Sequence, residues 1–341
     1  MSTTTTHLTP TASDVSRANP VTRVVLAIGV QNLSLILAIA ALVAAIGSQN
    51  SAFFLASNLK TIGTAVTISG LLALVQTVVI IMGGIDLAVG SIAGLASVTS
   101  AMIFVNSGAA ISFLGAVAIG ALCGLISGCI VVFGRVTPMI ATLAGLIAFK
   151  GVAQLVSNGR AQGYTGADAS YVFLARGSIL GIPTLIWVLG IVATLIHFIL
   201  RYTRVGRNIY AVGGNDTAAR LSGININRYI LCVFMLAGAV AALAGILITA
   251  RTGSGQPVSG SEGLEFQSIT AAALGGVALR GGKGSIGGTI LAVILLGILL
   301  NGMSLLGVNP FWQNVAQGTL LVAAVVIQQL RNGERRVGLP K

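Results

Sequence analysis

Long apolar runs separated by short polar segments dominate this sequence. Ten stretches are rich in Leu, Ile, Val, Ala and Gly and carry few charges. Their approximate bounds are 24–46, 62–82, 86–105, 109–133, 137–157, 179–200, 229–250, 264–279, 285–306 and 311–330. A helix needs about 20 apolar residues to cross the hydrocarbon core of a bilayer. The pattern therefore predicts an all-α polytopic membrane protein with about ten transmembrane helices.

The eighth stretch is shorter than the others. It begins at Leu264, carries Glu265 and Gln267 near its start, and runs into Gly275 and Gly276. Broken helices of this kind occur in transporters where the interrupted backbone lines a cavity. We expect a half-helix or a broken span here.

The composition agrees with a membrane protein. The chain is 55% hydrophobic and 8% charged, with a mean hydropathy of +0.97, whereas about a quarter of the residues of a soluble protein are charged. We expect residues 21–331 to form one transmembrane domain. Residues 1–20 are rich in Thr, Ser and Pro and are expected to be a disordered cytoplasmic tail, and 332–341 a second cytoplasmic tail.

The net charge of +12 would suggest nucleic-acid binding in a soluble protein. With ten spans and the N-terminus inside, fourteen Lys and Arg residues fall in inner segments and four in outer segments. This bias follows the positive-inside rule and predicts that both termini are cytoplasmic. We therefore expect the positive charge to face anionic lipid, with no nucleic acid as a partner.

The sequence predicts neither a catalytic nor a metal site. Cys123, Cys129 and Cys232 lie in apolar runs without metal-ligand spacing. The segment LRGGKGS at 279–285 departs from the phosphate-loop pattern, because Gly284 follows Lys283 where Ser or Thr is required. We therefore expect no cofactor on this chain, and any energy from ATP must come from another polypeptide.

A glycine-rich stretch, IMGGIDLAVGSIAG, lies at residues 81–94 between two apolar runs. Its notable positions are Gly83, Gly84, Asp86, Gly90 and Gly94. The first glycine pair can end a helix, and the carboxylate is expected to cap the next helix near the inner surface. The last two glycines are four apart and would let another helix approach closely. The similar GGVALRGGKGSIGG at 275–288 is either part of an internal repeat or a second glycine-rich turn.

Small residues recur every fourth position along the fourth run. They are Ala116, Gly120, Gly124 and Gly128. This spacing predicts a helix face for close packing against another helix.

The long inner segment at 201–228 contains the pattern of a short capped helix. AVGGNDTAARLSGI begins with a Gly-Gly turn, Asn215 or Asp216 can cap a helix through Leu221, and Gly223 can end it. Such a helix between two spans on the inner face is suited to docking another protein. The alternative is an ordinary solvated loop.

Several polar residues fall inside the apolar runs, where they must face protein or water. They are Gln76, Thr77, Gln154, Asn301, Gln313, Asn314 and Gln317. These residues are candidates for a translocation path, and the alternative for each is a hydrogen bond between helices. The carboxylates Asp86, Glu262 and Glu265 lie near span ends, which argues against a proton-driven carrier.

Three segments resemble membrane permeases of ribose/xylose/arabinose-type ABC importers. GGIDLAVGSIAG at 83–94 resembles their Gly-Gly-Ile-Asp-Leu-Ser-Val-Gly signature, with Ala88 where Ser is usual. FFLASNL at 53–59 resembles the segment after their first span, and GRNIYAVGGNDTAARLSGI at 206–224 resembles their coupling loop.

The resemblance implies a permease subunit in a bacterial inner membrane that pairs with a second permease copy, identical or related. An ABC ATPase subunit would bind ATP and Mg, and a periplasmic sugar-binding protein would deliver a monosaccharide. The fold should resemble the vitamin B12 importer permease. The matching coupling positions are Gly213, Gly214, Asn215, Ala218, Ala219 and Gly223. A permease for branched-chain amino acids or nucleosides, and a stand-alone secondary carrier, remain alternatives.

Overall fold

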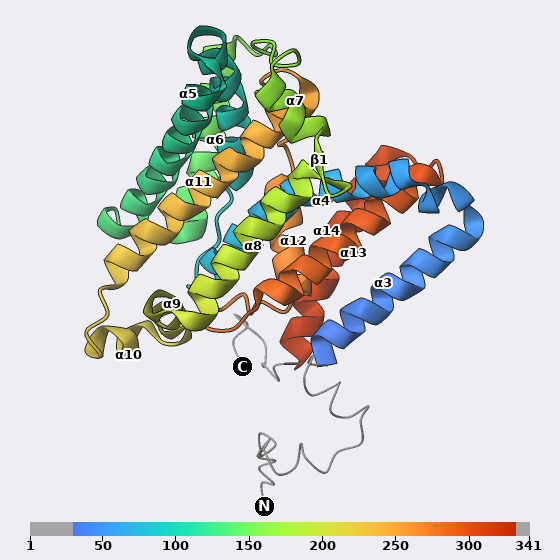
Figure 1. Ribbon diagram of the computed structural model, residues 1–341. Helices are drawn as coiled ribbons and strands as arrows, with labels where there is room; N and C mark the ends of the chain where they lie inside the picture. The colour runs from blue at the N-terminus through green and yellow to red at the C-terminus, as the bar shows by residue number, and fades with distance from the viewer. Residues whose placement is uncertain (1–29, 332–341) are drawn as a thin grey trace, which may run out of the picture.

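The computed structural model describes residues 30–331 and is almost entirely helical (Figure 1). In chain order its elements are α3 (Val30–Gln49), the 3-10 helix η1 (Ser51–Phe54), α4 (Ala56–Ile81), α5 (Val89–Phe133), α6 (Pro138–Ser157), α7 (Ala169–Arg176), β1 (Ser178–Ile179), β2 (Ile182–Pro183), α8 (Thr184–Tyr202), α9 (Arg204–Gly214), α10 (Asp216–Leu221), α11 (Ile226–Thr252), α12 (Leu264–Leu274), α13 (Ile286–Leu305) and α14 (Pro310–Arg331). The predicted tails, 1–20 and 332–341, lie outside the described residues.

Eight helices in the described part of the chain are long and apolar enough to cross a membrane. Within the described residues, each of the ten predicted stretches overlaps a helix or one arm of a helix. Two of them are the arms of α5, whose 45 residues are bent at Gly108 (φ 76°, ψ 175°). The two arms fold back on each other at this bend. The Ser112 hydroxyl of the second arm donates to the Ser100 carbonyl of the first arm at 2.6 Å. The all-α membrane fold is thereby confirmed.

Helix α4 runs through the centre of the molecule. In the most apolar part of α4, 89% of the residues are buried, whereas the corresponding share is 11% for α3 and 6% for α14. It packs against α8, α11, α12 and α13. Because α4 is enclosed by protein, its polar residues can be satisfied by neighbouring helices rather than by water.

The second arm of α5 packs closely on α11, as the four-residue spacing of small side chains predicts. A Cβ added to Gly124 would collide with the Phe234 carbonyl oxygen, and one added to Gly120 with the Gly238 carbonyl oxygen. Glycine on both helices therefore allows backbone-to-backbone contact, the mode of packing that small residues permit in membranes.

Two predicted boundaries differ from the structure. The sixth run was expected to begin at 179, but α8 begins at Thr184, because β1 and β2 pair in a hairpin whose turn holds Leu180 (φ 53°) and Gly181 (φ 78°). The inner segment 201–228 is mostly helical, since α8, α9, α10 and α11 cover all but a few of its residues.

The eighth run is the short helix α12, which confirms the expected half-helix.

The two ends of the described chain lie on one side of the molecule. In Figure 1 the start of α3 and the end of α14 lie towards the same side as α9 and α10, and α7 and β1 lie towards the opposite side. The chain therefore enters and leaves the helical body on the side that carries the short helices between α8 and α11.

Candidate functional site

Three glycine-rich segments meet at the C-terminal end of α4. We call this contact the glycine junction and define it by Gly83, Gly213, Gly281 and Gly282. The Gly282 N–H donates to the Ile81 carbonyl, the last of α4, at 2.8 Å. A Cβ on Gly213 would collide with that same carbonyl and would lie 2.8 Å from the Gly282 nitrogen. Backbone atoms alone therefore connect α4, α9 and the connection between α12 and α13.

Glycine is required at the junction for two different reasons. Gly83, Gly281 and Gly282 have φ values of 96°, 90° and 73°, a conformation that other residues rarely adopt. Gly213 has an ordinary helical backbone and is required for space. The turn at Gly83, which begins the stretch 83–94, thus lies beside the turn at Gly281 and Gly282 within the stretch 275–288.

Helices α9 and α10 form a capped pair on this side of the molecule. The Asn215 side chain accepts from the Ala218 N–H at 2.9 Å and caps α10, and Gly223 (φ 81°) follows its end. The predicted capped helix is confirmed. The predicted Gly-Gly turn is wrong: Gly213 and Gly214 are the last two residues of α9, and the chain turns at Asn215 instead.

The exposed and buried faces of α10 are distinct. Ala219 is buried against the protein, whereas Leu221 is 86% exposed at the end of the helix. Arg220 and Ala218 are also exposed. An exposed leucine beside a cation, on a short capped helix, is a surface suited to covering by another protein.

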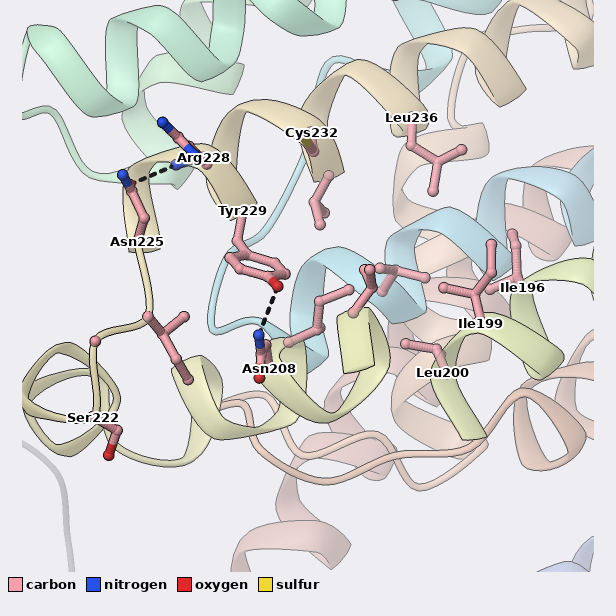
Figure 2. Close-up of a pocket in the computed structure, with 16 residues that line it drawn as sticks. Ile196, Ile199, Leu200, Asn208, Ser222, Asn225, Arg228, Tyr229, Cys232 and Leu236 are labelled. Atoms are coloured by element: carbon pink, nitrogen blue, oxygen red, sulfur yellow. Dashed lines mark hydrogen bonds between the residues drawn. The ribbon is translucent and has the colours of Figure 1, made fainter. Parts of the chain in front are cut away.

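A cavity of about 680 Å³ lies between α8, α9 and α11, beside the segment that follows α10 (Figure 2). Ile196, Ile199 and Leu200 of α8 face it from one side, and Leu236 of α11 from another. At its polar end Asn208 donates to the Tyr229 hydroxyl at 2.6 Å. The α9–α10 pair is therefore attached to α8 and α11, but its surface that faces this cavity is not tightly packed.

Tyr210 makes a second link from α9 to the connection between α12 and α13. Its hydroxyl donates to the Gly284 carbonyl at 2.8 Å. Burial raises the pKa of Tyr210, and the positive charge of Arg201 opposes this only in part. The tyrosine therefore stays protonated and remains a hydrogen-bond donor at neutral pH.

Asp86 is fully buried in the segment 82–88, between α4 and α5. One carboxylate oxygen accepts from the Ala88 N–H at 2.8 Å, and the other has no hydrogen-bond partner among the described residues. The Gln76 amide fits against the Asp86 backbone, donating to its carbonyl at 3.0 Å and accepting from its N–H at 3.2 Å. The Thr142 hydroxyl of α6 donates to the Ile85 carbonyl at 3.2 Å.

The prediction that Asp86 caps α5 is wrong. The helix begins at Val89, its N-cap residue is Ala88, two residues after Asp86, and no side chain caps it. The carboxylate instead closes a local turn with the N–H two residues on, a bond that aspartate commonly makes outside helices. Asp86 therefore stabilises the extended segment rather than the helix.

Gly90 and Gly94 face the connection between α11 and α12 rather than a packed helix. A Cβ on Gly94 would lie 2.8 Å from the Pro257 carbonyl oxygen, and one on Gly90 would collide with the Glu265 carboxylate. The predicted close approach is present, but the approaching backbone belongs mainly to residues 257–261. The start of α5 and the start of α12 therefore meet.

A second cavity, of about 330 Å³, opens where these two helix starts face α6; we call it the α6–α12 cavity. Its side chains with recognition chemistry are Ser91, Lys150, Ser261, Glu262, Glu265 and Phe266. The Lys150 ammonium forms an ion pair with the Glu262 carboxylate at 2.7 Å. The remainder of its lining is apolar and includes Leu87, Leu143 and Leu146.

The structure does not bring the seven predicted path residues together. Gln76 and Thr77 are fully buried in α4, and Thr77 shares a hydrogen bond of 2.7 Å with Thr289 of α13. The amides of Asn301 and Asn58 bond each other at 2.9 and 3.1 Å. Gln313, Asn314 and Gln317 lie on the peripheral helix α14, and Gln154 is exposed on α6. A path role for these residues stays a prediction.

Sequence reasoning missed the cluster of Lys150, Glu262 and Glu265. Lys150 and Glu262 are 112 residues apart, so no local pattern connects them. The available signal was a lysine deep inside an apolar run with Gln154 one turn later on the same helix face. Within residues 30–331 no group of three or more His, Cys, Asp or Glu side chains is arranged to hold a metal ion.

The family described as "Branched-chain amino acid transport system / permease component" matches residues 58–325. The ribose import permease protein RbsC of Escherichia coli K12 is 38% identical over 295 residues, which cover 86% of this chain and 92% of the relative. RbsC of Bacillus subtilis is 36% identical over 303 residues, covering 89% and 94%.

A third relative is the L-arabinose transport system permease protein AraH of Escherichia coli K12, 35% identical over 289 residues that cover 82% of this chain and 84% of the relative. No solved structure matches this chain. The family match spans the described helices from α4 onwards, except the first two residues of α4 and the last residues of α14. The chain is therefore a multi-pass membrane protein that belongs to the family of branched-chain amino acid transport system permease components.

Proposed function

We propose that this chain is the transmembrane permease subunit of an ABC importer that carries a monosaccharide of the ribose, xylose or arabinose kind. Its similarity to permeases named for ribose, D-allose and L-arabinose, over most of both chains, supports the cargo class. The glycine junction is the observation that carries the mechanism, because it joins a docking helix directly to the central span.

A separate ABC ATPase subunit binds ATP and Mg and docks on the α9–α10 pair. The exposed Leu221 provides an apolar contact, and the basic residues on this side of the chain favour its cytoplasmic placement. Gly213, Gly214, Asn215, Ala218, Ala219 and Gly223 shape this element: the first pair ends α9, the asparagine caps α10, and the last glycine ends it. Both termini then lie in the cytoplasm.

Movement of α9 passes to α4 through backbone contacts and towards α13 also through the Tyr210 side chain. Gly213 abuts the last carbonyl of α4, Gly282 is hydrogen-bonded to that carbonyl, and Tyr210 holds the Gly284 carbonyl just before α13. Contacts between backbones are stiff, since closely packed interiors have little free volume. Closure of the ATPase subunits therefore shifts α4 and α13 together and alternates access to the path.

The remaining partners follow from this arrangement. A periplasmic sugar-binding protein delivers cargo at the side opposite α10, and a second permease copy completes the path in the bacterial inner membrane. The vitamin B12 importer permease provides the expected fold, a likeness that a solved structure of this chain will test.

Reconstitution tests the proposal. The chain is purified together with an ABC ATPase and a sugar-binding protein from the same organism, and the complex is placed in liposomes with ATP inside. We expect ATP-dependent uptake of radiolabelled D-ribose, D-allose or L-arabinose. Sugar uptake by the chain alone, without the ATPase, would identify a secondary carrier and refute the proposal.

A related importer for branched-chain amino acids is the alternative that the family description favours. The same liposomes then distinguish the two cargo classes. Uptake of radiolabelled L-leucine in the absence of sugar uptake would establish the alternative and leave the ABC mechanism intact.

A further inference from the structure

Lys150, which forms an ion pair with Glu262, lies well inside the candidate membrane span α6. Among the described candidate spans, Lys150 is the basic residue farthest from either end of its helix. It lies seven residues before Ser157, the end of α6, which corresponds to about 10 Å along the helix. Its side chain is 36% exposed and that of Glu262 is 67% exposed.

Exposed charges at this depth determine what covers the surface. Ionisable groups inside a membrane face a water-filled cavity or other protein, because lipid cannot solvate them. The adjacent Gln154, one turn later on α6, is also exposed, which extends the polar strip along one helix face. The α6–α12 cavity therefore opens onto water or onto a second permease copy, and not onto acyl chains.

The lining of the cavity is mostly apolar, and its few polar groups suit the hydroxyl groups of a neutral sugar. Glu262 and Lys150 neutralise each other but retain free acceptor and donor positions that hydroxyl groups can use. Glu265 is 7% exposed and presents a second carboxylate at the start of α12. Phe266, 52% exposed beside it, offers an apolar ring for the C–H face of a sugar.

The size of the cavity also fits a small ligand. Its volume of about 330 Å³ is at the lower end of the range for small-molecule sites, which begins near 300 Å³. A zwitterionic amino acid would have to separate the Lys150–Glu262 pair to place its own charges, whereas a sugar binds to the intact pair. The observations therefore favour a monosaccharide over an amino acid.

The cavity is attached to the coupling machinery by a short segment. Its wall includes Ser91 at the start of α5, and residues 82–88 lead from there to Gly83 in the glycine junction. Both ends of this segment are held, by the junction on one side and by the contact of Gly90 with Glu265 on the other. A shift of α9 can therefore change the shape of the cavity.

We propose that the α6–α12 cavity is a contact site for the transported monosaccharide, in which Lys150 and Glu262 bond sugar hydroxyls and Phe266 packs on the sugar ring. This assignment rests on the proposed function. It names residues of the path that the sequence did not single out.

The test measures D-ribose uptake and ATP hydrolysis in the same liposomes, with the complete complex of permease, ATPase and binding protein. We expect Lys150→Met, Glu262→Gln and Phe266→Leu each to lower the sugar transported per ATP hydrolysed, by about tenfold for the charged positions, as expected for losing a hydrogen bond to a charged group. Lys60→Met on α4 and the exposed Phe311→Leu on α14 are matched controls and should leave the ratio unchanged.

The double variant Lys150→Glu with Glu262→Lys separates sugar contact from a purely structural ion pair. It can re-form the pair with the charges reversed, so a structural role predicts that the ratio returns to that of the wild type. A sugar contact predicts that the ratio stays low, because donors and acceptors have exchanged places.

Two results overturn the proposal. The first is an unchanged amount of sugar transported per ATP hydrolysed in Phe266→Leu and also in Lys150→Met or Glu262→Gln. The second is a full return of this ratio to the wild-type value in the double variant. Phe266→Leu buries no charge and keeps an apolar side chain, so it decides the matter if the charged variants do not assemble. Failure of the wild-type complex to transport any sugar with ATP would instead refute the proposed function itself.

Discussion

Replacing Gly213 by alanine should uncouple α9 from the central span. The added Cβ would collide with the Ile81 carbonyl oxygen and crowd the Gly282 nitrogen at 2.8 Å. Since ordinary contacts between carbon and oxygen need more than 3 Å, the backbones must separate by about 1 Å. The Gly282 N–H···Ile81 carbonyl hydrogen bond, 2.8 Å long, spans the same gap and is strained by that shift.

The energetic cost follows from two contributions. Overpacking a tightly packed site typically costs about 1–3 kcal/mol. Weakening one backbone hydrogen bond adds about 0.5–1.5 kcal/mol. We therefore expect Gly213→Ala to destabilise the folded permease by about 2–4 kcal/mol, unless α9 moves away and relieves the strain at the expense of coupling.

Gly214→Ala is a closely matched control. It is the next residue in α9, and a Cβ built there meets nothing within 4 Å. Both substitutions remove the same backbone freedom, so only the contact differs. Gly214→Ala should leave the thermal midpoint close to that of the wild type.

The assay has two readouts on the detergent-solubilised and the reconstituted complex. Thermal unfolding followed by size-exclusion chromatography reports stability, and sugar uptake per ATP hydrolysed reports coupling. Gly213→Ala should lower the midpoint, or lower the uptake ratio, or both. If Gly213→Ala and Gly214→Ala are indistinguishable from the wild type in both readouts, the glycine junction does not transmit movement.

Three further predictions use the same chain. Asp86→Asn should keep stability and most transport in liposome assays, because an amide oxygen can still accept from Ala88, whereas Asp86→Ala leaves that buried N–H unpaired and should cost about 1–3 kcal/mol in thermal unfolding; a complete loss of transport in a well-inserted Asp86→Asn variant would contradict this. Leu221→Asp should weaken ATPase binding at least about tenfold in pull-down titrations without changing the thermal midpoint, since the side chain is 86% exposed; equal binding would show that the ATPase docks elsewhere. Gly124→Val should separate α5 from α11 and cost about 3 kcal/mol or more in thermal unfolding, because even a Cβ meets the Phe234 carbonyl; an unshifted midpoint would refute that packing.

Features encoded by neighbouring residues could be predicted from the sequence. Apolar length located the helices, and the short eighth run indicated α12 correctly. The capped helix α10 followed from Asn215 and Gly223, since caps and helix ends depend on residues three or four apart. The close-packing face of α5 also followed from sequence, because its small residues recur every fourth position.

Features created by tertiary contact could not be predicted. Lys150 and Glu262 are brought together by the packing of α6 against the connection before α12, and each alone resembled an incidental charge. Gly213 looked like a turn residue because glycine pairs usually are, yet its helical backbone needs glycine for space against Ile81. Asp86 was assigned as a helix cap because a turn and a cap use the same side-chain oxygen.

The placement of the glycine-rich stretch explains why its parts occur together. Gly83 holds the N-terminal end of the segment 82–88 at the glycine junction, and Gly90 lets the Glu265 carboxylate reach the start of α5 at the other end. The segment between them is fixed by Gln76 of α4 and Thr142 of α6. A backbone clamped at both ends and bonded to two helices cannot absorb a displacement by local flexing, so movement of α9 must reach the α6–α12 cavity or break one of these contacts.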